Sequence, residues 1–256
     1  MTKRLLTGLA IAFLVTLMSL PAHALFVNGG FETGDTTGWT VTGDHAVVGS
    51  FTPQFNVSGS WTPTVPFYGA KTLQLGSPDI GYIPMDNAHT SSATQTGTVT
   101  QSDVDNGLTL FFRWAAFLEE PTNGFHDDYN MPYFSVKLSA YNSGSWSQIY
   151  YADHRANQPG FTLVGTAPYS AYDGNIMYGT DLASINLSTI GLGLGDQVKL
   201  DVYVQDCLQG GHGGLVFLDG FDTVRPNNPV PEPATMLLLG LGLVGLAGVS
   251  RKKFNK

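Results

Sequence analysis

The sequence predicts an all-β protein built as a two-sheet β-sandwich, and three observations support this prediction. Helical periodicity is nearly absent between residues 25 and 224. Short runs that alternate apolar and polar residues recur there, as they do in half-buried strands. Gly, Pro, Asn and Asp separate these runs, and these residues favour turns. Repeated short strands of this kind pack as two stacked sheets around one core.

Eight runs are predicted as strands: 45–50, 71–76, 93–101, 108–118, 133–141, 145–153, 197–205 and 214–224. Between the fifth and sixth runs, Asn142 and Gly144 can supply the positive-φ positions of a tight turn, so these two strands are expected to pair as a hairpin. Residues 188–197 contain GxGxG but not GxGxxG, and no helix pattern follows. We therefore expect a glycine-rich approach to the next strand rather than a nucleotide-binding loop.

The chain begins with the three parts of a secretory signal peptide. A positive start (Lys3, Arg4) and an apolar run (residues 5–20) precede an A-x-A cleavage site that ends at Ala24. Cleavage there would leave Leu25 as the new N-terminus. A retained transmembrane helix is the alternative, but the spacing of the A-x-A site favours cleavage and therefore export.

The body between residues 25 and 229 is acidic and holds six basic and 19 acidic residues, a formal charge of −13. This balance disfavours binding to nucleic acid or to anionic membrane surfaces, and it suits divalent cations or neutral, hydroxyl-rich partners. Cys207 is the only cysteine, so no disulfide can form within the chain. Stability must therefore come from the core of the sandwich.

The C-terminus consists of a proline-rich spacer (residues 225–233), a short apolar segment and a basic tip. The apolar segment, residues 234–249, would span roughly 24 Å as a helix, against a hydrocarbon core of about 30 Å. The basic residues after it would stay on the cytoplasmic side, so the body would lie outside. We expect a transmembrane helix that is short enough to hold the membrane only weakly.

The sequence Val230-Pro231-Glu232-Pro233, the apolar segment and the Arg/Lys tip together resemble the PEP-CTERM sorting signal of Gram-negative bacteria. The resemblance implies processing by exosortase, a membrane-embedded cysteine transpeptidase-like enzyme, and association with exopolysaccharide and biofilm production. It also implies transient anchoring in the inner membrane, followed by transfer to the cell surface or extracellular matrix. The prolines keep the segment extended and accessible. An anchor that is never processed is the alternative.

Residues 26–39 (FVNGGFETGDTTGW) contain N-x-x-F-E-x-G followed by G-W, and residues 217–224 are FLDGFDTV. Both segments resemble strands of galactose-binding-like jelly rolls, a fold shared by many carbohydrate-binding modules. The resemblance implies a jelly-roll sandwich and a structural calcium ion with Glu32 and Asp219 as its side-chain ligands. Calcium takes about six to eight oxygens, so backbone carbonyls would supply the rest. The alternative is that both residues are ordinary surface acids.

A second motif, D-C-x-x-G-G-H-x-G, extends from Asp206 to Gly214. It resembles a segment of envelope proteins of the same sorting class, and no activity is implied by it. We expect a hairpin loop between the last two strands, with glycines that allow a close backbone approach. Asp206 and His212 could hydrogen-bond within the loop or converge on a metal or polar ligand. Cys207 could be a nucleophile, but no orienting partner or oxyanion hole can be identified.

Residues 119–132 interrupt the strand pattern with an acidic stretch, and two carboxylates at a suitable separation can hydrolyse a glycosidic bond. The acids concerned are Glu119, Glu120, Asp127 and Asp128. The sequence otherwise lacks hydrolase and nucleotide motifs, since GxSxG, HExxH and a P-loop are absent.

Two of the tryptophans are expected to have different roles. Flat aromatic rings stack on sugars, and Trp146, beside the predicted hairpin turn, is the candidate for an exposed ring. Trp114 lies in an almost continuously apolar run and is expected in the core.

Together these observations predict a signal peptide (1–24), a β-sandwich domain (25–224), a Pro-rich linker with the PEP motif (225–233), and a sorting helix with a basic tip (234–256). The predicted function is non-catalytic: a surface or matrix protein that interacts with extracellular polysaccharide. Two alternatives remain open, a glycan-acting enzyme that uses residues 119–132 and a structural or adhesive protein that binds other proteins.

Overall fold

The computed structural model describes residues 25–53, 55–59, 68–77, 89–122, 130–167, 174–208 and 211–225. All of them belong to one compact unit, His23–Pro226. The predicted signal peptide with Ala24, the PEP motif and the apolar segment at 234–249 lie outside the described residues. In the described part of the chain, no helix is long and apolar enough to cross a membrane.

Strands dominate the described residues, and the single helix among them is short. The elements are β1 (Thr40–Thr42), β2 (His45–Val48), β3 (Asn56–Val57), β4 (Thr72–Gly76), β5 (Thr90–Thr98), α2 (Gln101–Asp105), β6 (Thr109–Pro121), β7 (Tyr133–Asn142), β8 (Ser145–Arg155), β9 (Thr162–Thr166), β10 (Gly174–Asn186), β11 (Gln197–Gln205) and β12 (Gly214–Asp222).

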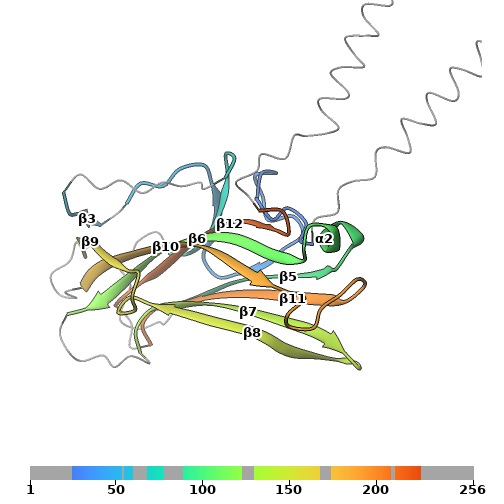
Figure 1. Ribbon diagram of the computed structural model, residues 1–256. Coiled ribbons are helices and arrows are strands. Elements are labelled where there is room, and N and C mark those ends of the chain that lie inside the picture. Colours follow the sequence, from blue (N-terminus) through green and yellow to red (C-terminus); the bar gives the residue numbers. More distant parts are fainter. Residues whose placement is uncertain are drawn as a thin grey trace, which may run out of the picture. The chain divides into compact units, whose positions relative to one another are not determined.

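These strands form two stacked antiparallel sheets (Figure 1). The five-stranded sheet has the order β1-β5-β11-β7-β8, and the seven-stranded sheet has the order β2-β4-β12-β6-β10-β9-β3. The chain crosses repeatedly between them: β4 and β6 belong to the seven-stranded sheet, while β5 and β7 belong to the five-stranded one. The predicted all-β class and two-sheet jelly-roll sandwich are confirmed.

One large apolar core lies between the two sheets. The five-stranded sheet contributes one face only, as β11 illustrates: Val198, Leu200 and Val202 are buried, whereas Lys199 between them is partly exposed. Alternation of this kind is expected when one face of an antiparallel sheet packs on a core and the other meets solvent. From the seven-stranded sheet, Trp114 of β6 enters the same core, as predicted.

The N-terminal segment packs against the last strand. The Trp39 ring lies 5.3 Å from the Phe31 ring and 5.1 Å from the Phe221 ring of β12. The backbone N–H of Phe221 donates to the carbonyl of Gly29 at 3.1 Å, and a Cβ at Gly29 would overlap the carbonyl oxygen of Phe221. The aromatic and glycine positions of the N-terminal motif therefore hold this segment on the sandwich.

Each of the eight predicted strands is present, although several boundaries differ by a few residues. The strands β1, β3, β9 and β10 were not predicted. In β10 the alternation of apolar and polar residues is irregular, because its ladder with β9 shifts register between Ile176 and Met177. The strand also contains Gly179, where a Cβ would lie 2.8 Å from the Phe161 ring, so packing requires the glycine that weakens the strand signal.

Two details of the predicted loops are wrong. β7 and β8 do pair as a hairpin, but the positive-φ residues of its turn are Ser143 (φ 51°) and Gly144 (φ 89°). Asn142 is instead the last residue of β7, paired with Ser145, so the connection has two residues. The segment between β11 and β12 is no hairpin loop, because these strands belong to different sheets.

Candidate functional site

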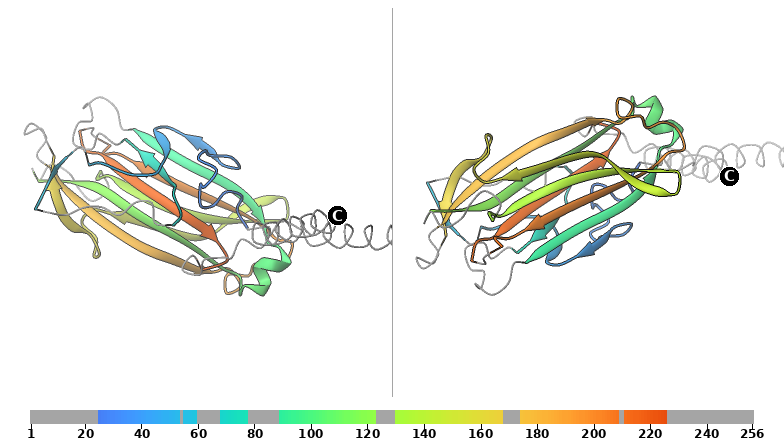
Figure 2. Two further views of the ribbon diagram at one scale, coloured as in Figure 1. Left: turned by 90° about the horizontal axis from the view of Figure 1, so that it is seen from above. Right: turned by 90° about the horizontal axis from the view of Figure 1, so that it is seen from below.

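The two outer faces of the sandwich differ in character. The outer face of the seven-stranded sheet is apolar and covered: Phe51 packs on Phe117 and Phe217 with ring centroids 5.2 and 4.9 Å apart. Phe55 joins the same buried cluster. The outer face of the five-stranded sheet carries polar and aromatic side chains, and the right-hand view of Figure 2 presents it with β11, β7 and β8 side by side.

We call the outward-facing part of β7, β8 and β11 the aromatic face. Strand register places its members in cross-strand rows, since Tyr133 pairs with Arg155 and Gln205, and Tyr141 pairs with Trp146. Its residues in these rows are Tyr133, Ser135, Lys137, Ser139, Tyr141, Trp146, Gln148, Tyr151, Asp153, Arg155, Lys199, Asp201, Tyr203 and Gln205.

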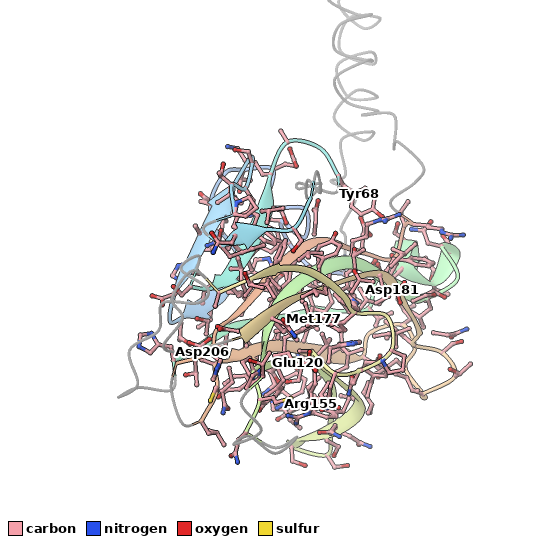
Figure 3. All side chains as sticks on the ribbon, turned by 90° about the vertical axis from the view of Figure 1, so that its left-hand side faces the viewer. Tyr68, Glu120, Arg155, Met177, Asp181 and Asp206 are labelled. Atoms are coloured by element: carbon pink, nitrogen blue, oxygen red, sulfur yellow. The ribbon has the colours of Figure 1, made fainter. Side chains whose placement is uncertain are left out.

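One aromatic cluster lies at the Tyr133 end of this face. The rings of Tyr133 and Tyr203 are 6.0 Å apart, and the guanidinium of Arg155 lies 4.7 Å from the centre of the Tyr133 ring. Arg155 is labelled in the lower part of Figure 3. Burial raises the pKa of the Tyr133 phenol, and the neighbouring Tyr203 and Tyr151 raise it further. Its hydroxyl therefore stays protonated at neutral pH and can donate a hydrogen bond.

A second aromatic cluster lies at the hairpin end. The rings of Tyr141 and Trp146 are 5.2 Å apart, and the ammonium of Lys199 lies 5.4 Å from the centre of the Trp146 ring. Tyr141 is 45% exposed and Trp146 is 37% exposed. The prediction that Trp146 presents an exposed ring beside the turn agrees with this position.

Ion pairs occupy the middle of the face. Asp201 Oδ2 lies 3.3 Å from Lys137 Nζ and 3.7 Å from Lys199 Nζ, and Asp201 Oδ1 accepts a hydrogen bond from the Thr94 hydroxyl at 2.8 Å. A further ion pair, between Asp153 and Arg155 at 3.1 Å, lies at the Tyr133 end. Flat rings at both ends and paired donors and acceptors between them suit an extended ligand with hydroxyl groups and apolar ring faces.

Sequence reasoning identified only Trp146 among these residues. The tyrosines could have been found from the period of two in YFSVKLSAY and QVKLDVYVQ, which places Tyr133, Tyr141 and Tyr203 on the polar side of their strands. That two separate strands lie next to each other, with these sides aligned, follows only from the fold.

Glu32 and Asp219, the predicted calcium ligands, both lie beside Gly30. A Cβ at Gly30 would be 3.6 Å from Asp219 Oδ1 and 3.8 Å from Glu32 Cγ. Asp219 Oδ2 accepts a hydrogen bond from the Tyr68 N–H at 2.8 Å, and Glu32 Oε1 accepts from the N–H groups of Ala70 at 2.9 Å and Lys71 at 3.0 Å. These amides hold both carboxylates in position beside Gly30.

This pair is remote from the aromatic face. In Figure 3, Tyr68, whose N–H reaches Asp219, is labelled on the opposite side of the unit from Arg155. Among the described residues, no group of three or more His, Cys, Asp and Glu side chains could hold a metal ion. A cation at Glu32 and Asp219 would therefore depend on backbone oxygens.

Asp206 and His212 lie at the crossing between the sheets, and each is 2% exposed. Asp206 Oδ1 accepts a hydrogen bond from the Gly214 N–H at 2.8 Å, while the His212 carbonyl accepts from the Cys207 N–H at 2.9 Å. These bonds support the structural interpretation of the motif. Its ligand-binding interpretation stays a prediction. Cys207 is buried and forms no disulfide.

The acidic stretch 119–132 is only partly a loop. Glu119 lies within β6, is fully buried, and accepts a hydrogen bond from the Gly213 N–H at 3.1 Å. Glu120 is also in β6 and only partly exposed, while Asp127 and Asp128 lie outside the described residues. Burial of Glu119 removes it from contact with a solvent-borne glycan.

Fold and site together define a β-sandwich with one covered face and one open aromatic face. Residues 229–252 match the PEP-CTERM protein-sorting motif. The match covers the C-terminal segment alone, and it confirms the predicted sorting signal and indicates an exported protein with a transient membrane anchor. No curated protein sequence matches the chain.

Several solved carbohydrate-binding modules are similar to this chain. A CBM28 specific for non-crystalline cellulose is 15% identical, with 79% of this chain and 96% of that chain covered and a TM-score of 0.35. CBM27-1 of Caldicellulosiruptor saccharolyticus, solved with mannohexaose, is 14% identical, with 77% and 94% covered and a TM-score of 0.36. A xylan-binding domain of CBM 22 is 16% identical, with 74% and 98% covered and a TM-score of 0.22. These scores are low, and the strand pairing described above is what defines the sandwich.

Proposed function

We propose that the protein is an exported, non-catalytic polysaccharide-binding protein and that the aromatic face is its binding site. One observation supports this proposal most strongly. Among the described residues, the aromatic side chains that are clearly exposed are Tyr141, Trp146 and Tyr151, and all three lie on this face.

Exposed aromatic rings are costly to leave in water, and a gathering of them marks an interaction site. The apolar face of a pyranose ring can stack on such a ring, and its hydroxyl groups can exchange hydrogen bonds with the Ser, Asp and Lys side chains between the clusters. The openness of the sheet also suits a chain better than a small molecule, which generally binds in a concave pocket.

A glycan array with the protein from Leu25 onward, in mild detergent, tests the proposal. Binding should weaken about tenfold or more in Trp146→Ala, because an aromatic anchor contributes strongly to an interface. Leu163→Ala, which alters a 54% exposed side chain of β9 in the other sheet, is the matched control. Absence of binding to every glycan, together with Trp146-dependent capture of a purified envelope protein, would favour the adhesive alternative.

We also propose that exosortase processes the C-terminal segment after export. The match at residues 229–252 supports this step. Replacement of Pro231 and Pro233 by Ala should leave the full-length chain in the inner-membrane fraction, whereas the wild-type chain should become shorter and leave that fraction. Equal processing of both chains would contradict the proposal.

We further propose a structural calcium ion between Glu32 and Asp219. The support is their common position beside Gly30, which brings two carboxylates, the oxygen ligands that calcium prefers, close together. Such an ion would link the N-terminal segment to β12. The hydrogen bond between Gly29 and Phe221 already joins these two parts of the chain.

A further inference from the structure

The charge of the aromatic face differs from that of the rest of the body. Between residues 25 and 229 there are six basic and 19 acidic residues. Three of the basic residues, Lys137, Arg155 and Lys199, lie on the aromatic face, where the acids are Asp153 and Asp201. This face is therefore net positive on a strongly acidic protein.

The cations are also placed next to the rings. Arg155 lies over the Tyr133 ring at 4.7 Å, and Lys199 lies over the Trp146 ring at 5.4 Å. Each aromatic cluster thus combines a stacking surface with a cation, a contact that is favourable by itself. A sugar that stacks on either cluster would hold a carboxylate substituent close to the cation, and a charged hydrogen bond is stronger than one to a neutral hydroxyl.

The two clusters are arranged along a line. Tyr133 and Tyr141 stand at opposite ends of β7, about 26 Å apart at roughly 3.3 Å per residue. Lys137 lies midway between them on the same side of the strand. An extended polymer with repeated acidic groups could meet all three cations at once.

We infer that the ligand of the aromatic face is an acidic polysaccharide whose sugars carry carboxylate groups, an inference that rests on the proposed function of this face. The lysines and the arginine bind the carboxylates, and the aromatic rings stack on the sugars that carry them. The acidic remainder of the body repels a polyanion, so the bound chain stays on this face.

The probe that tests this inference is polygalacturonic acid, compared with the same polymer after full methyl esterification, which removes the charge and keeps the sugar. Titration calorimetry without added divalent cations avoids calcium bridging. The acid should bind more tightly than the ester, and added salt should weaken the binding of the acid but not that of the ester. Lys137→Met and Lys199→Met should each weaken binding to the acid about two- to fivefold, the range expected for exposed charge pairs. Lys71→Met, beside the other sheet, should leave it unchanged.

The outcomes separate this inference from the proposed function. Equal binding to acid and ester that is lost in Trp146→Ala but retained in Lys199→Met would keep the polysaccharide site and overturn the acidic ligand. No binding to either polymer, nor to any glycan on the array, would overturn both. Folding of each variant is checked by its thermal unfolding, since exposed lysines contribute little to stability.

Discussion

Asp206 Oδ1 accepts a hydrogen bond from the N–H of Gly214 at 2.8 Å, which joins the end of β11 in one sheet to the start of β12 in the other. The carboxyl is 2% exposed, and among the described residues its Oδ2 has no hydrogen-bond partner. Burial raises the pKa of Asp206 from 3.8 to about 7, while the bond from Gly214 acts in the opposite direction. A carboxyl with this environment is protonated in much of the acidic range.

The first prediction concerns pH and Asp206. Because the folded-state pKa lies above the unfolded value, stability from this group is complete below about pH 4 and is lost as the pH rises to about 7. The free energy of unfolding should decline over this interval by up to about 4 kcal/mol from this group. Asp206→Asn, which keeps the acceptor for Gly214, should flatten the decline. Urea unfolding at a series of pH values measures the free energy of unfolding of both proteins. An equal decline with pH in the wild type and the variant would contradict the role of Asp206.

A second prediction concerns the contact between Gly29 and Phe221. Gly29→Ala places a Cβ against the Phe221 carbonyl and should lower the free energy of unfolding by about 1 to 3 kcal/mol, as overpacking commonly does. Gly193→Ala is the matched control, because the nearest atom to its Cβ, Asp196 Oδ2, is 3.9 Å away. Equal losses in the two variants would show that the close approach of Gly29 has no special role.

The strands that alternate cleanly could be predicted from the sequence. β7 and β11 place apolar residues at every second position, and the hairpin between β7 and β8 has a tight turn with glycine. β10 could not be predicted in this way, because Gly179 accommodates the Phe161 ring and the register shift breaks the alternation. Its identity as a strand depends largely on its long ladder with β6, which is distant in sequence.

The candidate site was predictable only in part. Trp146 was identified because it adjoins the turn, whereas Tyr203 reaches the same face from β11, paired with Ser135 of β7. Pairing of β11 with β7 is a property of the fold, and no local signal in either strand specifies it. Glu119 is a candidate that the local sequence suggested wrongly. Its acidic neighbours indicated a loop, but β6 continues through Glu119 and buries it.

The third prediction tests the calcium ion. About 1 mM calcium should raise the melting temperature of the wild-type protein, because a ligand that binds only the folded state stabilises it. Glu32→Gln and Asp219→Asn should lose this increase. A melting curve that responds to neither calcium nor chelator would remove the proposed ion. Measurement of bound metal after dialysis provides a second readout, independent of stability.

The fourth prediction uses Asp201 to raise the positive charge of the aromatic face. Asp201→Asn keeps the acceptor for the Thr94 hydroxyl but frees Lys137 and Lys199 from their shared partner. Binding to polygalacturonic acid should become about two- to fivefold tighter, and binding to the methyl ester should not change. The melting temperature should change little, because surface ion pairs contribute at most about 1 kcal/mol. Asp105→Asn, at the exposed end of α2, removes the same charge elsewhere and is the control. If both variants bind the acid more tightly by the same factor, net charge alone explains the gain and the local role of Asp201 is refuted.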